Sequence, residues 1–377
     1  MRVGILGAGQ LGRMLVLAGR PLGHEFVLLD PVAPSPGGEV ASQQVAEFGD
    51  RAALAALADR CEVVTFEFEN VPAEALRALE VRVPVHPSAR ALEITQDRLL
   101  EKRLFRDLGI PTAPFLPVES EEELRDALAA IGCPAVLKTR RLGYDGKGQF
   151  VLRSLADVPP AWARLGGAPL VLEGFVPFER EISVVASRNT RGEVVVYPPI
   201  ENRHRDGILR LSLAPAPGAS DDLVTRSRLK ATRLLEALDY VGTLAVEMFE
   251  LDGHLLANEM APRVHNSGHW TIEGAETSQF ENHLRAILGL PLGSPRARGV
   301  SAMVNVIGEL PPTSQVLAVP GAHLHLYGKE PRPGRKLGHV TVRADDAHEL
   351  ADRRGQLGAV LGVPELLADV TPHAPRT

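Results

Sequence analysis

Two glutamates, Glu247 and Glu259, stand in a predicted β-hairpin where they could hold a metal ion between them. Alternating apolar and polar residues lie on both sides of Asp252-Gly253, which is a strong turn signal. A two-residue turn would pair Glu247 with Asn258, whereas a three-residue loop centred on Gly253 would place Glu247 opposite Glu259. Because neighbouring carboxylates repel each other, the second register predicts a site for Mg²⁺, an ion held by few carboxylates and by substrate phosphates. An exposed hairpin with two ordinary glutamates is the structural alternative.

A glycine-rich loop upstream has the composition of a phosphate-binding segment. It joins strands predicted at 134–138 and 149–153, follows Lys138, and contains Gly143, Tyr144, Asp145, Gly146, Lys147, Gly148 and Gln149. Backbone N–H groups in such a loop can approach phosphates, and lysines can offset the phosphate charge. The loop differs from a Walker A sequence because no Gly-Lys-Ser/Thr opens a helix. A surface hairpin without a ligand is the alternative.

The apolar strand predicted at 170–176 is interrupted at Glu173-Gly174. A purine base typically bonds to backbone groups at such a strand end, and a nearby carboxylate such as Glu181 can accept bonds from ribose hydroxyls. This strand therefore favours nucleotide binding beside the glycine-rich loop.

A polar loop containing Arg263, His265 and Asn266 directly follows the second glutamate. Such a loop suits an anionic intermediate, because Arg supplies charge while His and Asn supply hydrogen bonds. His265 and His269 have an i, i+4 spacing that could bind zinc on a helix. The proline before the loop and the glycine within it argue against a helix, and no HExxH pattern is present. We expect no zinc.

Lysine is rare in this chain, with six lysines among 41 basic residues. In a chain so rich in Arg, the remaining lysines indicate places where a compact ammonium is needed. Four of the six are Lys138 and Lys147 of the glycine-rich region and Lys329 and Lys336 of the segment 329–336. That segment holds four cations among rigid prolines, so it is either a phosphate-holding loop or a solvated one.

The glycines Gly7, Gly9 and Gly12 follow a predicted strand and open a predicted helix, and Asp30 ends the next strand. This is the outline of a dinucleotide fingerprint, in which phosphate meets the helix N-terminus. Tight strand-to-helix turns in any α/β domain need similar glycines, and Gln10 would place a side chain in the pyrophosphate path. We therefore favour a scaffold turn that touches a substrate over a cofactor site.

Composition and charge narrow the class of protein. The 377 residues suffice for two or three domains, and 45% hydrophobic with 23% charged residues is typical of a soluble globular protein. A net charge of -6 argues against nucleic acid as the main ligand. No apolar run reaches membrane-spanning length, and the glycine-interrupted start does not fit a signal peptide. Cys61 and Cys133 lie far apart, which argues against a disulfide scaffold and fits a reducing compartment. We expect a cytoplasmic enzyme.

The predicted elements indicate an α/β chain with several domains, some of them α+β. Residues 1–95 alternate strand and helix, which predicts a parallel sheet covered by helices. Residues 96–178 combine a leading helix with a smaller unit of one helix and short strands. Antiparallel strands, a helix and the hairpin follow in 179–300, and short strands dominate 301–377.

Four segments, in the right order along nearly the whole chain, resemble the N5-carboxyaminoimidazole ribonucleotide synthetase family of the ATP-grasp superfamily. They are GQLGRM at 9–14, GYDGKGQ at 143–149, NEMAPRVHNSGHWT at 258–271 and KEPRPGRKLGH at 329–339. The resemblance implies an ATP-grasp fold. Its parts would be a Rossmann-like domain over 1–95, a small subdomain over 96–178 whose glycine loop acts as a lid, a large subdomain over 179–300 and a C-terminal domain over 301–377.

The resemblance also assigns roles to individual residues of this sequence. The implied ATP-binding residues are those of the loop 143–149 together with Arg98, Lys138, Glu173, Gly174, Phe175, Val176, Glu181, His204, Asn258 and Glu259. The implied Mg²⁺ ligands are Glu247 and Glu259, and the implied catalytic residues are Lys138, Arg263, His265 and Asn266. The implied ribonucleotide-binding residues are Tyr144, Asp145, Lys329, Arg335, Gln10 and Glu67. Ala261 stands where many superfamily members have a third metal-ligating Asn, so Mg²⁺ would rely on two carboxylates and phosphate oxygens.

The implied reaction uses ATP to convert hydrogencarbonate into carboxyphosphate, which carboxylates 5-aminoimidazole ribonucleotide in purine biosynthesis. ATP and Mg²⁺, with Mn²⁺ as a substitute, are the implied cofactors, without NAD, and the implied assembly is a homodimer. Phosphorylation turns a poor leaving group into a good one, and the site must exclude water because carboxyphosphate hydrolyses readily. The alternatives are a formate-dependent glycinamide ribonucleotide transformylase, a non-catalytic nucleotide-binding regulator and an NAD-dependent dehydrogenase.

Overall fold

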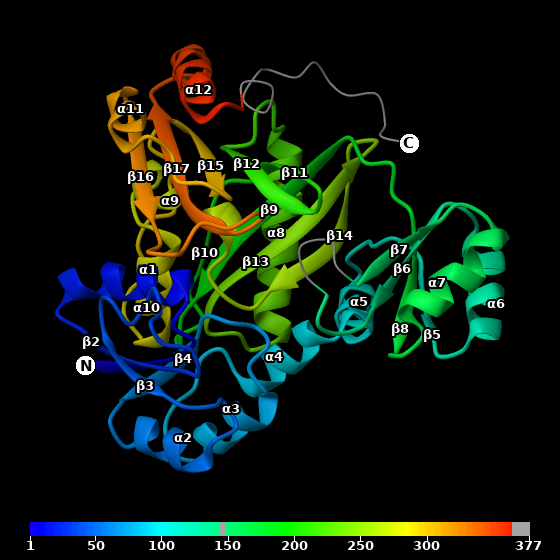
Figure 1. Ribbon diagram of the computed structural model, residues 1–377, viewed down its shortest axis with the longest axis horizontal. Helices are drawn as coiled ribbons and strands as arrows, with labels where there is room; N and C mark the ends of the chain where they lie inside the picture. The colour runs from blue at the N-terminus through cyan, green and yellow to red at the C-terminus, as the bar shows by residue number, and fades with distance from the viewer. Residues whose placement is uncertain (144–147, 364–377) are drawn as a thin grey trace.

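The computed structural model describes residues 1–143 and 148–363. Three sheets organise these residues, and Figure 1 shows the smallest antiparallel unit standing to one side of the other two sheets. Within the described ranges, none of the helices combines the length and the apolar character needed to cross a membrane.

The N-terminal unit is a parallel sheet in the order β3-β2-β1-β4, as the alternating pattern predicted. Its strands are β1 (Arg2–Leu6), β2 (Glu25–Asp30), β3 (Ser42–Val45) and β4 (Val63–Phe66), and its helical segments are α1 (Gln10–Gly19), η1 (Arg20–Leu22), α2 (Arg51–Ala58), α3 (Ala73–Glu80) and α4 (Ala89–Gln96). Strand residues alternate between two cores because successive side chains point to opposite faces. Leu15 of α1 packs on one face with Leu284 of α10 (Gln279–Ile287), and Leu57 of α2 packs on the other with Leu76.

A smaller antiparallel sheet has the order β5-β8-β6-β7. Helix α5 (Arg98–Asp107) leads into it, and its elements are β5 (Phe115–Val118), α6 (Glu121–Ile131), β6 (Ala135–Thr139), β7 (Gln149–Leu152), η2 (Leu155–Asp157), α7 (Val158–Leu165) and β8 (Leu170–Gly174). The side chain of Ser120 accepts a bond from the N–H of Glu123, which begins α6 at the predicted capping position. Leu128 of α6 and Ala161 of α7 pack against Leu172 of β8, so both helices cover one face.

The largest sheet has the order β14-β13-β9-β11-β12-β15-β17-β16, with β10 paired to β9. Its strands are β9 (Arg180–Arg188), β10 (Val194–Val196), β11 (Ile200–Arg205), β12 (Ile208–Ala214), β13 (Gly242–Leu251), β14 (His254–Ala261), β15 (Val300–Ile307), β16 (Ala322–Leu326) and β17 (Lys336–Ala344). Leu213 of β12 lies opposite Ala302 of β15. The C-terminal strands therefore extend the sheet that carries the hairpin.

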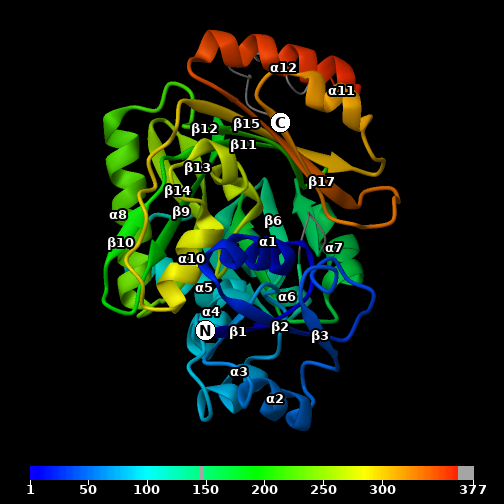
Figure 2. The ribbon, with the colours of Figure 1, turned by 90° about the vertical axis from the view of Figure 1, so that its left-hand side faces the viewer.

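Helical segments cover both faces of this sheet. They are α8 (Asp221–Ala237), η3 (Asn266–Gly268), α9 (Thr271–Gly274), α10, α11 (Thr313–Ala318) and α12 (Ala347–Leu361). Leu234 of α8 packs with Val184 and Val246 behind the hairpin. Figure 2 shows α11 and α12 on the outer side of β15 and β17, where Leu357 packs against Val340. The hairpin strands thus lie on a rigid, well-packed support.

Candidate active site

The hairpin places Glu247 of β13 directly opposite Glu259 of β14, so the predicted pairing is confirmed. The predicted three-residue loop, however, is wrong. The strand residues that flank Asp252 and Gly253 pair with each other, which leaves a two-residue turn. Both turn residues are left-handed, with φ of 49° and 71°. Two left-handed residues give a turn whose twist matches the twist of the strands it joins.

A β-bulge in β14 restores the pairing that a two-residue turn alone would prevent. Met248 lies opposite Ala257, and the next pair is Glu247 with Glu259, so Asn258 is the extra residue. The extra residue shifts the side chains after it to the other face of the strand. Bulges commonly occur next to active sites, where they re-aim a side chain. The chain therefore reaches the predicted carboxylate pair by a bulge instead of a longer loop.

The two carboxylates are buried and electrostatically coupled. Burial and the charge of Glu259 raise the pKa of Glu247 to about 7. Burial also opposes ionisation of Glu259, but Arg98, whose Nη1 lies 2.6 Å from Glu259 Oε2, lowers the pKa of that carboxyl overall. A cation between the two groups would relieve their repulsion and keep both ionised.

The donor atoms of this pair fit a hard divalent cation. The side-chain Oδ1 of Asn258 is buried and makes no hydrogen bond to any part of the chain that the structure describes. Asn258, Glu247 and Glu259 all line one cavity, so three oxygen-bearing side chains face the same space. In residues 1–143 and 148–363 no group of three or more His, Cys, Asp or Glu side chains could hold a metal ion. An ion here would therefore also need substrate oxygens, as Mg²⁺ usually does.

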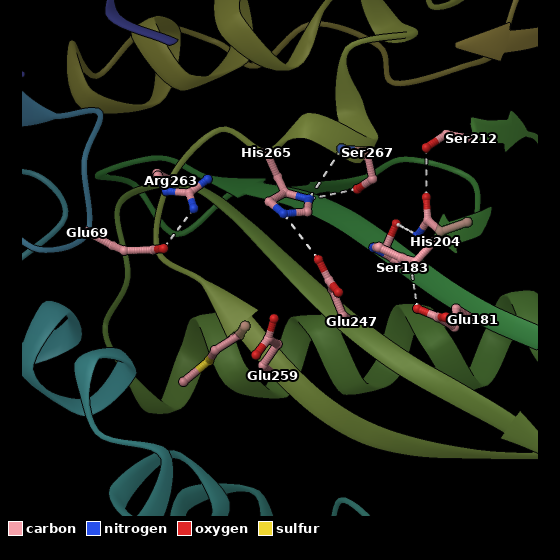
Figure 3. Close-up of polar contacts among 12 residues, drawn as sticks. Glu69, Glu181, Ser183, His204, Ser212, Glu247, Glu259, Arg263, His265 and Ser267 are labelled. Carbon is pink, nitrogen blue, oxygen red and sulfur yellow. Dashed lines mark hydrogen bonds and ion pairs between the residues drawn. The ribbon is translucent and has the colours of Figure 1, made fainter. Parts of the chain in front are cut away.

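His265 presents a defined tautomer to Glu247. Its Nδ1 accepts a bond from the N–H of Ser267 at 3.3 Å, so the ring proton lies on Nε2, which is 3.1 Å from Glu247 Oε1. Burial and the charge of Arg263 hold the pKa of His265 well below its usual range. The imidazole is thus neutral and donates its Nε2–H to the carboxylate, as the dashed line in Figure 3 shows.

The other residues of this loop present charge and unused hydrogen-bonding groups. Arg263 forms an ion pair of 2.7 Å with Glu69, which holds the guanidinium beside the cavity. Both polar side-chain atoms of Asn266 are buried and find no partner among the described residues. Buried polar groups normally have partners, so Asn266 is placed to bond a ligand. The structure therefore brings the three predicted residues of this loop to the side of the cavity where the carboxylate pair lies.

Two lysines share one buried carboxylate on the other side of the cavity. Lys138 of β6 and Lys102 of α5 lie 3.0 and 3.1 Å from the same oxygen, Oε2 of Glu173. Burial alone would raise the pKa of Glu173, but the two ammonium groups lower it to about 2. Lys138 lines the cavity, whereas Lys102 is only 1% exposed and lies behind it. Glu173 therefore holds Lys138 in place.

The predicted nucleotide-binding strand end also lines the cavity, with Gly174, Phe175 and Val176. The N–H groups of Gly174 and Phe175 already donate to the carbonyls of Pro114 and Pro134. A purine base at this edge would therefore have to use other backbone groups. Phe178 stacks on Phe249 with ring centroids 4.5 Å apart. Both rings line the cavity and give it an apolar wall.

The predicted ribose partners meet at the same end of the cavity. Glu181 Oε2 lies 2.6 Å from His204 Nδ1, and Figure 3 shows this pair on the strands beside the hairpin. Burial opposes protonation of His204, but the bond to Glu181 raises its pKa overall. The pair presents a charged, oriented edge to a polar ligand.

The helix N-terminus of the glycine fingerprint is filled by a side chain of the protein itself. The carboxylate of Glu67 accepts bonds from the N–H groups of Gly9, Leu11 and Gly12 at 2.7 to 3.1 Å. A Cβ at Gly7, where φ is +103°, would meet Glu67 Cγ at 2.6 Å. The glycines therefore make room for Glu67, which occupies the position where a dinucleotide phosphate would bind.

Of the cations in the segment 329–336, the structure brings some to the cavity and others not. Lys329 Nζ donates to Gln10 Oε1 at 2.5 Å, and Gln10 lines the cavity. Lys329 itself is not part of the cavity lining, whereas Lys336 is. Arg335 instead donates to the carbonyl of Glu330 and is not part of the lining. The predicted Tyr144, Asp145, Gly146 and Lys147 lie outside the described residues.

One cavity of about 1090 Å³ connects these groups. Its wall runs from Gln10 and Glu67, past Glu247 and Glu259, to Phe175 at the nucleotide end. The volume exceeds that of an ordinary single-ligand pocket, so it can hold more than one small molecule.

Comparison with known proteins identifies the family. The model of the ribonucleotide synthetase preATP-grasp domain matches residues 1–96, that of the ATP-grasp domain matches 103–280, and that of the phosphoribosylaminoimidazole carboxylase C-terminal domain matches 301–353. A Pseudomonas aeruginosa protein named N5-carboxyaminoimidazole ribonucleotide synthase is 54% identical over 365 residues, which cover 96% of this chain and 99% of that protein. The chain belongs to the N5-carboxyaminoimidazole ribonucleotide synthase family.

Solved structures of this synthase family agree with the fold. The N5-carboxyaminoimidazole ribonucleotide synthetase of Thermus thermophilus has a TM-score of 0.92 and 56% identity, covering 99% of this chain and 100% of that one. The synthase of Aspergillus clavatus in complex with ADP and 5-aminoimidazole ribonucleotide has a TM-score of 0.88 and 36% identity, covering 96% and 98%. The chain described here is therefore a ligase of the ATP-grasp family, and the comparisons do not support the dehydrogenase, transformylase or regulator alternatives.

The sequence interpretation missed two buried residues of α5. They are Lys102, described above, and Glu101, whose carboxylate accepts a bond from the N–H of Met260 at 2.7 Å. Burial and the charge of Glu259 raise the pKa of Glu101 to about 8. The rarity of lysine was a signal for Lys102, but nothing in the sequence around Glu101 indicated which side of the helix faces the cavity.

The structural role of Glu67 can be tested by measuring the free energy of unfolding of a variant. We expect Glu67→Gln to lower the free energy of unfolding by about 1–3 kcal/mol, because the amide offers one acceptor oxygen to three buried N–H groups. Urea unfolding measures the change, with Glu74→Gln, an exposed glutamate of α3, as the matched control. A Glu67→Gln protein as stable as the Glu74→Gln control would contradict the structural role.

Proposed function

We propose that this chain uses ATP to phosphorylate hydrogencarbonate and then carboxylates the exocyclic amine of 5-aminoimidazole ribonucleotide, releasing ADP and phosphate. One observation carries the proposal. A single cavity joins the strand end at Gly174, the carboxylate pair Glu247 and Glu259, and the far end at Gln10. The reaction needs such a path, because an unstable intermediate made at one end must meet a second substrate without reaching water.

The groups around the pair suit phosphoryl transfer. A hydrogencarbonate oxygen attacks the γ-phosphorus of ATP while the bond to the β-phosphate oxygen breaks. Lys138 and Arg98 would offset negative charge on the transferring group, and Glu173 keeps the lysine oriented. Mg²⁺ held by Glu247, Glu259 and phosphate oxygens would supply further charge neutralisation.

The loop after the hairpin suits the second step. The amine nitrogen attacks the carboxyl carbon, loses a proton, and phosphate leaves. Arg263 would attract the anionic intermediate, and Asn266 offers both a donor and an acceptor that the described part of the chain leaves unused. Neutral His265 orients Glu247 through its Nε2–H, so it keeps the carboxylate aimed into the cavity.

The end of the cavity near Gln10 suits the ribonucleotide, whose phosphate requires a cation. Burial lowers the pKa of Lys329 to about 8, although the charge of Glu67 opposes this shift. Lys329 is thus protonated below pH 8 and loses its charge above it. We expect kcat/KM for the ribonucleotide to fall about tenfold per pH unit above pH 8, because this quantity reports the ionisation of the free enzyme.

A matched variant separates Lys329 from other titrating groups. Lys329→Arg keeps a positive charge at any working pH, so the decline above pH 8 should disappear even if the overall kcat/KM is lower. The measurement is a pH profile of kcat/KM with ATP saturating. An identical decline in the Lys329→Arg enzyme would assign the titration to another group.

Phosphate release from ATP tests the proposed reaction directly. We expect release with hydrogencarbonate and Mg²⁺, and a clear increase when 5-aminoimidazole ribonucleotide is added, together with formation of the carboxylated product. No stimulation by the ribonucleotide would refute the assignment. We also propose a cytoplasmic homodimer on the basis of the family resemblance, and sedimentation equilibrium would give its mass directly.

A further inference from the structure

The cationic segment 329–336 lies between β16 and β17, and contacts of Tyr327 with β17 close its base. The N–H of Tyr327 donates to the carbonyl of Leu337 at 2.9 Å, and the Tyr327 hydroxyl lies 2.7 Å from His339 Nδ1. Tyr327 is 2% exposed and His339 is fully buried. The Tyr327–His339 pair thus joins β17 to the residue directly after β16, at the base of the segment between them.

Lys329 rests on this base. Its Nζ lies 6.0 Å from the centre of the Tyr327 ring and donates to Gln10 of α1. Tyr327 and Gln10 both line the cavity. In Figure 1 the orange strands β16 and β17 stand above the blue helix α1. The bond from Lys329 to Gln10 therefore joins the segment between these strands to the N-terminal unit. The ring face supports the ammonium, and the hydroxyl fixes the orientation of the ring.

His339 is in turn held by other rings. It stacks on His325 with centroids 4.5 Å apart and an interplanar angle of 12°, and its ring lies 4.7 Å from that of His269. His325 Nε2 lies 2.6 Å from Glu273 Oε1 of α9. Burial holds the pKa of His339 well below its usual range, so the imidazole is neutral. The histidine stack therefore links the Tyr327 hydroxyl to Glu273 of α9 through His339 and His325.

We propose that Tyr327 and His339 are positioning residues for ribonucleotide binding, because their hydrogen bond orients the segment that carries Lys329 toward the cavity. This inference rests on the proposed function, which assigns the ribonucleotide to this end. Neither residue takes part in phosphoryl transfer at the carboxylate pair. Loss of the bond should therefore weaken ribonucleotide binding and leave the ATP-dependent step intact.

Three substitutions test the bond itself. Tyr327→Phe removes only the hydroxyl. His339→Asn places an amide where Nδ1 stands and preserves the bond, whereas His339→Gln places it at the position of Nε2 and loses the bond. We expect the KM for 5-aminoimidazole ribonucleotide to rise about tenfold in Tyr327→Phe and His339→Gln, the effect of one hydrogen bond, and to stay near native in His339→Asn. The KM for ATP and phosphate release without ribonucleotide should change less than about twofold.

Tyr197→Phe is the matched control for losing a buried tyrosine hydroxyl. Tyr197 is 1% exposed and its hydroxyl donates to the carbonyl of Thr277 at 2.8 Å, away from the cavity lining. This variant should lose stability without changing the KM for the ribonucleotide.

Two results would overturn the inference. In the first, Tyr327→Phe and His339→Gln lose stability as Tyr197→Phe does but bind the ribonucleotide normally. In the second, His339→Asn is impaired as strongly as His339→Gln. A native enzyme that the ribonucleotide does not stimulate would instead refute the proposed function, so the two failures are distinguishable.

Discussion

Replacing Glu259 with Gln is expected to lower kcat by about 10³-fold while the protein remains folded. Glu259 is the carboxylate that Arg98 keeps ionised, and it faces Glu247 across the bulged hairpin. The amide can still accept the bond from Arg98, so packing is preserved. It cannot supply the negative charge that a divalent cation requires, and loss of that charge also lowers the pKa of Glu247.

The measurement is turnover as a function of Mg²⁺ concentration, with thermal unfolding of the same samples. The matched control is Glu250→Gln in β13, the other strand of the hairpin, because Glu250 pairs with Arg180 and lies outside the cavity lining. We expect the control to retain near-native turnover and to lose some stability through its broken ion pair. Unchanged turnover of Glu259→Gln at low Mg²⁺ would rule out a metal-binding role.

Replacing Lys138 with Met is expected to lower kcat by about 10²–10³-fold, because Lys138 lines the cavity and, in the proposed reaction, its ammonium would offset charge on the transferring phosphoryl group. Burial lowers the pKa of Lys138 although Glu173 opposes the shift, so its charge depends on that carboxylate. Glu173 keeps Lys102 as a partner in the variant, which protects the fold from an unpaired buried charge.

Lys102→Met is the matched control because both lysines contact the same oxygen of Glu173. Lys102 is buried behind the cavity wall, so its loss should mainly reduce the free energy of unfolding, by about 1–3 kcal/mol for one lost bond to a buried carboxylate, with a smaller change in kcat. Steady-state kinetics and urea unfolding of both variants separate the two roles. Equal losses of kcat in both variants would mean that the pair acts as a unit instead.

Local periodicity predicted most of the fold. The parallel sheet over 1–95 and the capped helix at Ser120 follow from patterns within a few residues of each other. The hairpin is more instructive, since its predicted loop length was wrong and its predicted pairing was correct. The turn followed the twist preference of Asp252-Gly253, and the bulge at Asn258 absorbed the register change. Sequence patterns rarely reveal a bulge, because its location depends on the packing of both faces of the strand.

The candidate site was predictable where its residues form contiguous motifs and not where they come from the interior of a helix. Arg263, His265 and Asn266 are neighbours in sequence and remain neighbours in space. Glu101 reaches the cavity and Lys102 reaches Glu173 only because of how α5 packs against β14 and β8, which is a tertiary property. Arg335 shows the converse, since it lies in a strong motif yet turns to a backbone carbonyl.

The carboxylate of Glu67 at the start of α1 has a consequence for inhibitor design. Compounds that imitate NAD or other dinucleotides rely on a free helix N-terminus for their pyrophosphate, and here that cradle is already occupied from within. Such scaffolds would have to displace a buried side chain that makes three hydrogen bonds. A selective compound should therefore reach from the Phe178–Phe249 wall toward Gln10 and leave the glycine turn alone.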